Sequence, residues 1–111
     1  MPGSEGEVRV ALATAPDWDT AARIARALVE ERLAACANLV PGVRSIYRWQ
    51  GRVEDAAEVL LVLKTRADRV DALGVRLRAL HPYELPELVA LPAAGGIADY
   101  LDWVVGEASA P

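Results

Sequence analysis

The first apolar segments of the chain predict a buried strand followed by an amphipathic helix. Residues 7–15, EVRVALATA, are largely apolar and stop before Pro16, which indicates a covered strand. Beyond the proline, apolar residues recur at the spacing of one helix face, at Ala21, Ile24 and Leu28. We expect Asp17 or Asp19 to cap this helix, because a carboxylate can accept the free N–H groups of the first turn. The helix is expected to end near Ala35.

The pattern of residues 37–65 predicts a long hairpin of two strands. Gly51 lies near its middle and can take the positive φ that a tight turn requires. The Pro-Gly pair at residues 41–42 indicates a bend or bulge near the start of the first strand. The second strand is apolar on both faces, and Glu58 and Lys64 lie at its ends on the same face. Alternation gives the first strand a common face of Val43, Ser45, Tyr47 and Trp49.

The rest of the pattern predicts two more helices and a fourth strand. Thr65 followed by Asp68 resembles a capping box for a helix that has to end before Pro82. Residues 87–91, ELVAL, indicate a strand, and residues 97–105, IADYLDWVV, indicate a short helix. The inward faces of the two helices are Val70, Leu73, Leu77 and Leu80 in the first, and Ile97, Leu101 and Val104 in the second.

The predicted elements run β-α-β-β-α-β, with a further helix at the end. Right-handed crossovers fold this order into an α+β, ferredoxin-like sandwich, in which two helices cover one face of an antiparallel sheet. The chain fits a single domain of residues 1–111, with an ordered core of about 8–105. Because the strands are apolar on both faces, and Tyr47 and Trp49 lie far along the hairpin, we expect another subunit to cover them.

Composition and charge narrow the classes of function. The net charge is −4 and the pI about 4.9, with scattered basic residues, which argues against nucleic-acid binding. Residues 1–7, MPGSEGE, lack the regions of a signal peptide, and the longest aliphatic run, residues 59–63, is far short of the ~20 residues of a membrane span. The single cysteine, Cys36, favours a reducing compartment. We therefore expect a cytoplasmic protein that binds neither nucleic acid nor membrane.

Four strings of residues occur in order and at suitable spacing: LAACANLVPGVRSIYRWQG, EVLLVLKT, HPYELPELVALP and YLDW. Together they resemble the CutA family, the divalent-cation tolerance proteins, over about residues 8–103. The resemblance implies a ferredoxin-like fold and a tight homotrimer in which the long hairpin reaches a neighbour. It also implies a cytoplasmic role in tolerance to copper and other divalent metals, with Cu(II) binding in some members and no catalysed reaction.

The only histidine, His81, is the first candidate for a metal ligand. It resembles the family position to which copper binding is attributed in some members, and a neutral imidazole is a good copper ligand. The positions that assist it in those members are Ala13 and Leu80 here, which cannot ligate a metal. The alternative is that His81 caps a helix C-terminus, where the helix dipole favours an imidazolium. Cys36 is a weaker candidate for a copper ligand, and a small buried residue is its alternative role.

A polar set lies at strand ends and in the loop before the fourth strand: Trp49, Glu58, Lys64, Tyr83, Glu84 and Glu87. In a trimer these residues can line an inter-subunit cleft, or Glu58 or Glu87 can form an interface ion pair with Lys64. Both alternatives stay open. We expect a trimer that binds divalent metal, Cu(II) above all. The alternative is a small-molecule sensor or interaction scaffold with clefts like those of PII proteins, which share the fold. We do not expect an enzyme, because the residues suggest no reaction.

Overall fold

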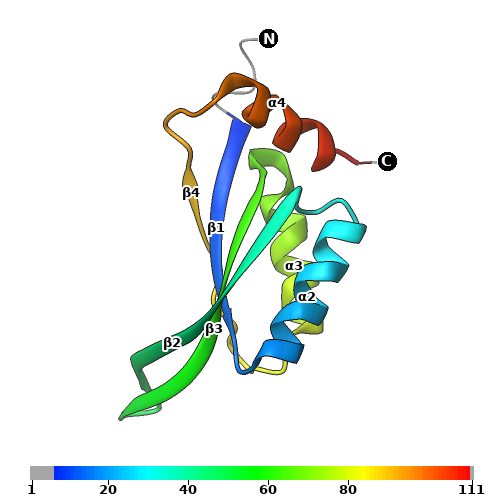
Figure 1. The fold of residues 1–111 in the computed structure, drawn as a ribbon. Coiled ribbons are helices and arrows are strands. Elements are labelled where there is room, and N and C mark those ends of the chain that lie inside the picture. The colour runs from blue at the N-terminus through cyan, green and yellow to red at the C-terminus, as the bar shows by residue number, and fades with distance from the viewer. Residues whose placement is uncertain (1–6, 111) are drawn as a thin grey trace.

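The computed structural model describes residues 7–110, which form one sheet flanked by helices (Figure 1). Residues 1–6, on which the argument against a signal peptide mainly rests, lie outside the described part. The strands are β1 (Val8–Ala15), β2 (Cys36–Trp49), β3 (Arg52–Arg66) and β4 (Val89–Pro92). The helices are α2 (Trp18–Glu30), the short 3-10 helix η1 (Ala67–Arg69), α3 (Val70–Leu80) and α4 (Ala98–Glu107). None of these helices has the length and apolarity that a membrane span requires.

The sheet has the strand order β2-β3-β1-β4, and each neighbouring pair is antiparallel. β1 pairs with β3 along its whole length, from Val8 opposite Arg66 to Ala15 opposite Val59. The short β4 pairs with β1 at one edge, and β2 forms the other edge. Helices α2 and α3 lie side by side on one face (Figure 1). The predicted α+β class, with an antiparallel sheet and a long hairpin, is confirmed.

The main core lies between α2, α3 and the sheet. Alanines on β1 and α2 are fully or almost fully buried, which lets the helix backbone approach the sheet closely: Ala11, Ala13, Ala15, Ala21 and Ala25. Larger side chains fill the space between them, namely Ile24, Leu28, Leu61, Leu63, Leu73 and Leu77. Burying each such side chain contributes about 1.5–3 kcal/mol before the entropy of ordering it is subtracted. The predicted inward stripes of both helices are thus confirmed at their central residues.

A second apolar cluster joins α4 to the end of the sheet. Leu101 and Val104 of α4 are buried here together with Val8, Ala35 and Ala108. The prediction that Ile97 also points inward is wrong, because this side chain is 77% exposed. Ile97 has an extended backbone, with φ −70° and ψ 121°, and precedes the first turn of the helix. Its side chain therefore does not continue the stripe of Leu101 and Val104.

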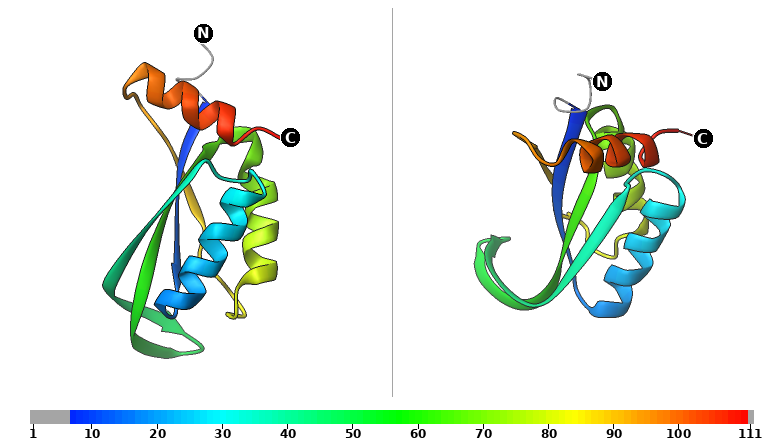
Figure 2. Two further views of the ribbon diagram at one scale, coloured as in Figure 1. Left: turned by 45° about the vertical axis from the view of Figure 1, so that its right-hand side comes forward. Right: turned by 45° about the horizontal axis from the view of Figure 1, so that its top comes forward.

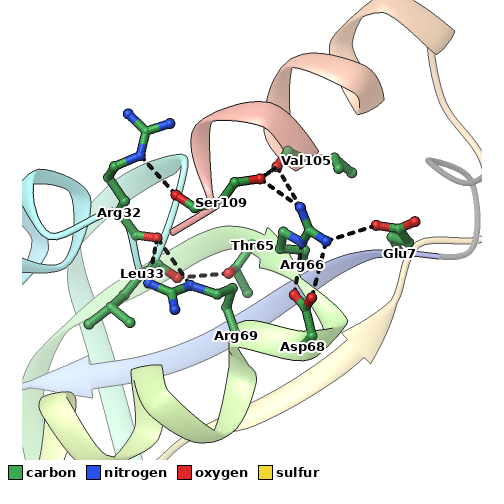
Figure 3. Close-up of polar contacts among 9 residues, drawn as sticks. All are labelled: Glu7, Arg32, Leu33, Thr65, Arg66, Asp68, Arg69, Val105 and Ser109. Carbon is green, nitrogen blue, oxygen red and sulfur yellow. Dashed lines mark hydrogen bonds and ion pairs between the residues drawn. The ribbon is translucent and has the colours of Figure 1, made fainter. Parts of the chain in front are cut away.

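Arg66 at the end of β3 connects this cluster to the C-terminal segment. Its Nη1 donates to the Val105 carbonyl at 3.3 Å and to Ser109 Oγ at 2.6 Å (Figure 3). The same guanidinium forms ion pairs with Asp68 at 2.8 Å and with Glu7 at 3.4 Å. The Val105 carbonyl, in the last turn of α4, thus accepts from both Arg66 and the Ser109 hydroxyl. The network fixes α4 against the sheet.

The hairpin of β2 and β3 extends beyond the rest of the sheet and curves along its length (Figure 2). Its register shifts between Val40 and Val43, which confirms the bulge predicted at residues 41–42. The turn is made by Gln50 and Gly51, with φ values of 50° and 81°. Positive φ at both central residues matches the twist of a two-residue hairpin turn. The predicted turn at Gly51 is confirmed.

The face of the sheet opposite α2 and α3 is apolar and uncovered in the single chain. Alternation assigns it a row of aliphatic side chains from all four strands: Val10, Leu12, Val40, Leu60, Val62, Val89 and Leu91. Val89 and Leu91 are 53% and 48% exposed. A large contiguous apolar surface of this kind is typical of an interface. The expectation that another subunit covers it stays a prediction.

One of the two predicted boundaries of α2 differs from the structure. Asp17 is the N-cap of α2 and accepts from the Thr20 N–H at 2.8 Å, so one of the two predicted caps is confirmed. The helix ends at Glu30 and not near Ala35, because Arg32 adopts a positive φ of 59°. This left-handed residue stops the helical hydrogen-bond pattern. The chain then reaches Cys36, where β2 begins.

The predicted capping box of Thr65 and Asp68 is wrong. Thr65 is fully buried in β3, and its Oγ1 donates to the Leu33 carbonyl at 2.7 Å. Asp68 accepts from Arg66 and does not cap a helix. The tertiary hydrogen bond of Thr65 replaces the local one that its spacing suggested. The fourth strand also begins later than predicted, at Val89, since only residues 89–92 pair with β1.

Candidate functional site

His81 follows the last residue of α3 and connects this helix to the end of β1. The side chain is 8% exposed. Nε2 lies 2.7 Å from the Thr14 carbonyl, and Nδ1 accepts from the Tyr83 N–H at 3.1 Å. Because a carbonyl can only accept and an N–H can only donate, these partners select the neutral tautomer with its proton on Nε2. His81 is the C-cap residue of α3, and its ring contacts fix the loop that follows the helix.

The residues around His81 do not fit a copper site. Either ring nitrogen would have to lose its hydrogen bond before it could bind a metal ion. Ala13 is buried in the core and Leu80 packs beside it, so neither supplies a donor. Nowhere in residues 7–110 do three or more His, Cys, Asp or Glu side chains gather in a way that could hold a metal ion. A single imidazole without such companions makes a weak site.

Glu58 and Tyr83 form the central polar contact of the candidate site. The Tyr83 hydroxyl donates to Glu58 Oε2 at 2.7 Å, and the rings of Tyr83 and His81 lie 4.6 Å apart. Glu58 is only 7% exposed. Burial, and then the hydrogen bond to the Glu58 carboxylate, raise the pKa of Tyr83 well above its ordinary value. Tyr83 thus acts as a hydrogen-bond donor to a buried carboxylate.

This contact lies in the wall of a cleft between the hairpin and the segment that leads into β4. The cleft has a volume of about 770 Å³, within the usual range of small-molecule sites. Its lining includes five of the six polar residues predicted from the sequence: Trp49, Glu58, Tyr83, Glu84 and Glu87. Thr14 and residues 45–48 line it from β1 and the hairpin, and residues 85–89 complete the other wall. The cleft is formed within one chain.

The cleft is rich in negative charge. Glu58, Glu84 and Glu87 line it against one cation, Arg48, and none of the three carboxylates forms an ion pair with the described residues. Burial, and then the negative charge of Glu58, raise the pKa of Glu87. Because the negative charges of Glu58 and Glu87 repel each other, a cation that enters the cleft is attracted to both.

Lys64, the sixth predicted residue, does not reach the cleft within one chain. It is six residues along β3 from Glu58, which is roughly 20 Å at about 3.4 Å per residue. Its Nζ donates to Asn38 Oδ1 and lies 4.0 Å from Cys36 Sγ, on the facing part of β2. Cys36 begins β2 and is partly exposed. The two candidate ligands Cys36 and His81 therefore belong to different regions of the sheet.

Several cleft residues were not singled out by the sequence. Thr14 contributes its backbone carbonyl to His81, and every residue type carries that group, so no sequence signal exists for it. Arg48 neighbours Trp49, but strand alternation assigns its side chain to the opposite face of β2. A period-two pattern could not have predicted it in the cleft. Tyr47 shares the face of Trp49, and that alternation could have included it among the cleft residues.

Comparison with known proteins gives matches along nearly the whole chain. The family model described as CutA1 divalent ion tolerance protein matches residues 9–107. The divalent-cation tolerance protein CutA of Thermus thermophilus is 56% identical over 95 residues, 86% of this chain and 92% of that protein. Protein CutA of mouse is 48% identical over 99 residues, which cover 89% of this chain and 56% of the mouse protein. A solved structure described as PII-like protein CutA from Nostoc is 42% identical, with a TM-score of 0.85 and coverage of 93% of this chain and 99% of that one.

Proposed function

The chain belongs to the CutA1 family of divalent ion tolerance proteins, and on this premise we propose that it supports tolerance to divalent metal ions, copper among them, as a ligand-binding homotrimer and not as an enzyme. The observation that carries the proposal is the acidic cleft, in which Tyr83 holds the buried Glu58 carboxylate. A cleft of this size and polarity is suited to reversible binding of a ligand. Occupancy of the cleft is then the signal that links the protein to the metal response.

A small molecule is the occupant that the geometry favours. The cleft volume of about 770 Å³ suits such a ligand, whereas the described residues contain no group of three potential metal ligands. Both ring nitrogens of His81 are engaged by backbone groups. The PII-like description of the Nostoc relative supports a sensor or scaffold role for this chain as well.

Direct binding of Cu(II) or another divalent cation is the second candidate. Three carboxylates, Glu58, Glu84 and Glu87, line the same cleft, and carboxylate oxygen suits divalent cations. We assign the metal-contacting groups to these oxygens and not to His81, with a neighbouring subunit completing the ligand set. Cys36 lies beside Lys64, away from these carboxylates, and is left outside the site.

The homotrimer is proposed from the surface of the chain. The apolar face opposite the helices is typical of a surface that another subunit buries. The projecting hairpin is suited to reach such a neighbour. In such an assembly Lys64 of one subunit is a candidate ion-pair partner for Glu58 or Glu87 of the next. The strand order β2-β3-β1-β4 supports the ferredoxin-like assignment, and the single cysteine supports a reducing compartment such as the cytoplasm.

Growth under copper stress tests the proposed function. Cells that lack this protein are complemented with the wild type, with Glu58→Gln, or with Glu30→Gln as a control of equal charge change on α2. We expect the wild type and the control to restore growth across a Cu(II) series, and the Glu58 variant to fail although it accumulates normally. Full rescue by Glu58→Gln would remove the cleft from the function. In parallel, Cu(II) is titrated into the purified proteins, and saturable binding that Glu58→Gln leaves unchanged excludes Glu58 as a metal ligand.

A further inference from the structure

The turn after α3 is closed by a side chain whose contact requires one protonation state. The backbone N–H of Tyr83 donates to Nδ1 of His81 at 3.1 Å, and Nε2 of the same ring lies 2.7 Å from the Thr14 carbonyl. The ring is buried, and both partners belong to its own chain. An N–H can donate to Nδ1 only while that nitrogen carries no proton. A proton on Nδ1 would therefore set two donors against each other.

The same turn positions Tyr83 against the sheet. The Tyr83 hydroxyl donates to Glu58 Oε2 on β3 at 2.7 Å, and its ring lies 4.6 Å from that of His81. His81 thus holds Tyr83 at its backbone, and Glu58 holds it at its hydroxyl. A displacement of the backbone at residue 83 moves the hydroxyl as well, since only two side-chain torsions lie between them.

The charged groups around the turn give an imidazolium no fixed partner. No Asp or Glu among residues 7–110 forms an ion pair with the ring. Two cations contact the chain beside it, Arg23 of α2 at the Leu80 carbonyl and Arg78 of α3 at the Glu84 carbonyl. The other ionisable groups that act on this segment or belong to it are Asp17, Tyr47, Glu58, Glu84 and Glu87. The carboxylates favour a positive ring and the arginines oppose it, so the hydrogen bonds of the two ring nitrogens decide which form of the turn takes up a proton.

We propose that His81 is an acid-sensitive latch of the turn at residues 81–84. A solvent proton taken up by Nδ1 breaks the bond to the Tyr83 N–H, opens the turn and withdraws the Tyr83 hydroxyl from Glu58. In the closed turn the new N–H points at another donor, whereas in the open turn water accepts from it. Protons therefore shift the population toward the open turn. The inference goes beyond the proposed function, because it requires neither a ligand nor a neighbouring subunit.

NMR spectra of the intact protein over a pH series test the latch. His81 is the only histidine, so its ring signals are unambiguous. From about pH 8 to about pH 5, where imidazoles commonly change charge, we expect a proton on Nε2 alone at first and on both nitrogens at the end. The Tyr83 amide signal should shift with the same midpoint as the ring. Its protection against hydrogen exchange, corrected for the intrinsic effect of pH, should fall by about two- to tenfold, as loss of one hydrogen bond implies.

His81→Asn is the matched variant, because an asparagine oxygen two residues before Tyr83 can accept from its N–H and does not titrate. We expect the Tyr83 amide of this variant to keep its signal and its protection across the pH series. Glu87→Gln is the second variant, since it keeps the ring and removes a carboxylate whose pKa is raised by burial and by the charge of Glu58. The Tyr83 step should remain at full amplitude in Glu87→Gln.

Three outcomes overturn the latch. The first is a ring that keeps its single proton on Nε2 down to about pH 5. The second is a Tyr83 amide that does not follow the ring. The third is the same step in His81→Asn, or its loss in Glu87→Gln, either of which assigns the step to a carboxylate. If His81→Asn does not fold, the ring and amide signals of the wild type and of Glu87→Gln decide the question.

Discussion

At the scale of single residues, hydrogen-bond partners decide roles that residue type leaves open. His81 stands out in the sequence as the only histidine, but its hydrogen-bond partners cannot be recognised there. Thr14 is 67 positions away, and both contacts involve backbone groups, which every residue type carries. The polar set around Tyr83 was predictable from the strings that contain it. Its one direct contact, with Glu58, was not, because strand parity gives the face of a side chain and not its tertiary neighbour.

Tyr83→Phe should lower the free energy of unfolding by about 1–3 kcal/mol at pH 8, because the buried Glu58 carboxylate loses its donor. Since the pKa of Tyr83 is raised above its ordinary value of 10.0 in the folded state, the unfolded chain ionises first as the pH rises. The stabilisation is fully present below pH 10 and declines above it. The difference between wild type and variant should therefore narrow from pH 8 to pH 11.

Urea denaturation at fixed protein concentration measures both effects, since unfolding of an oligomer depends on concentration. Tyr47→Phe is the control, because the Tyr47 hydroxyl makes no hydrogen bond to the residues described. It should change stability by about 0.5 kcal/mol or less. A constant difference between wild type and Tyr83→Phe across this pH range would contradict the assigned contact.

At the scale of elements, the sequence predicted strands better than the end of the first helix. The strand pattern predicted the hairpin, the Pro-Gly pair predicted its bulge, and Gly51 predicted its turn. These features depend on local backbone chemistry, which the sequence shows directly. The end of α2 was missed because an arginine, Arg32, takes the left-handed conformation, for which glycine is the usual signal. Its guanidinium donates to the Ser109 carbonyl at 2.8 Å and its own carbonyl accepts from Arg69, and such tertiary contacts stabilise the position (Figure 3).

The hairpin turn offers a prediction at this scale. Gly51→Ala should destabilise the protein by about 1–2 kcal/mol, because an alanine at a φ of 81° meets the penalty of the left-handed region although no atom lies near its Cβ. Gln50→Asn should have the opposite sign, by a few tenths of a kcal/mol, since asparagine tolerates positive φ better. Thermal denaturation of both variants measures the changes, and a stable Gly51→Ala protein would argue against this turn geometry.

At the scale of the whole molecule, the apolar residues on both faces of the strands predicted a covering subunit, which a single chain does not contain. The sequence indicated strands that are apolar on both faces, and the structure leaves the face with Val89 and Leu91 open. Burial against a neighbour depends on a second copy, so neither the partner surface nor its register could be derived from one chain. The cleft was foreseen as a polar set, and only the folded hairpin gave it a volume.

Leu91→Glu should disrupt the proposed trimer, because a carboxylate on the apolar face has to be desolvated at the interface. Light scattering should give three times the chain mass of 11.9 kDa for the wild type and a smaller mass for the variant. Val75→Glu is the control, since Val75 is 74% exposed on α3, on the other side of the sheet. A wild-type protein with the mass of one chain would end the trimer proposal.

The bulge between Val40 and Val43 has a consequence for how this chain can change in length. Lys64 and Glu58 lie on the same open face of the sheet. Before the bulge the even-numbered residues of β2 share this face, and after it the odd-numbered residues do. Deleting a single residue at 41–42 would remove the bulge and restore plain alternation, so that Tyr47 and Trp49 would keep the face of Glu58. A single deletion should therefore be tolerated at residues 41–42, whereas a single deletion elsewhere in β2 would turn every residue beyond it to the other face, which makes this short segment the part of the strand most free to change in length.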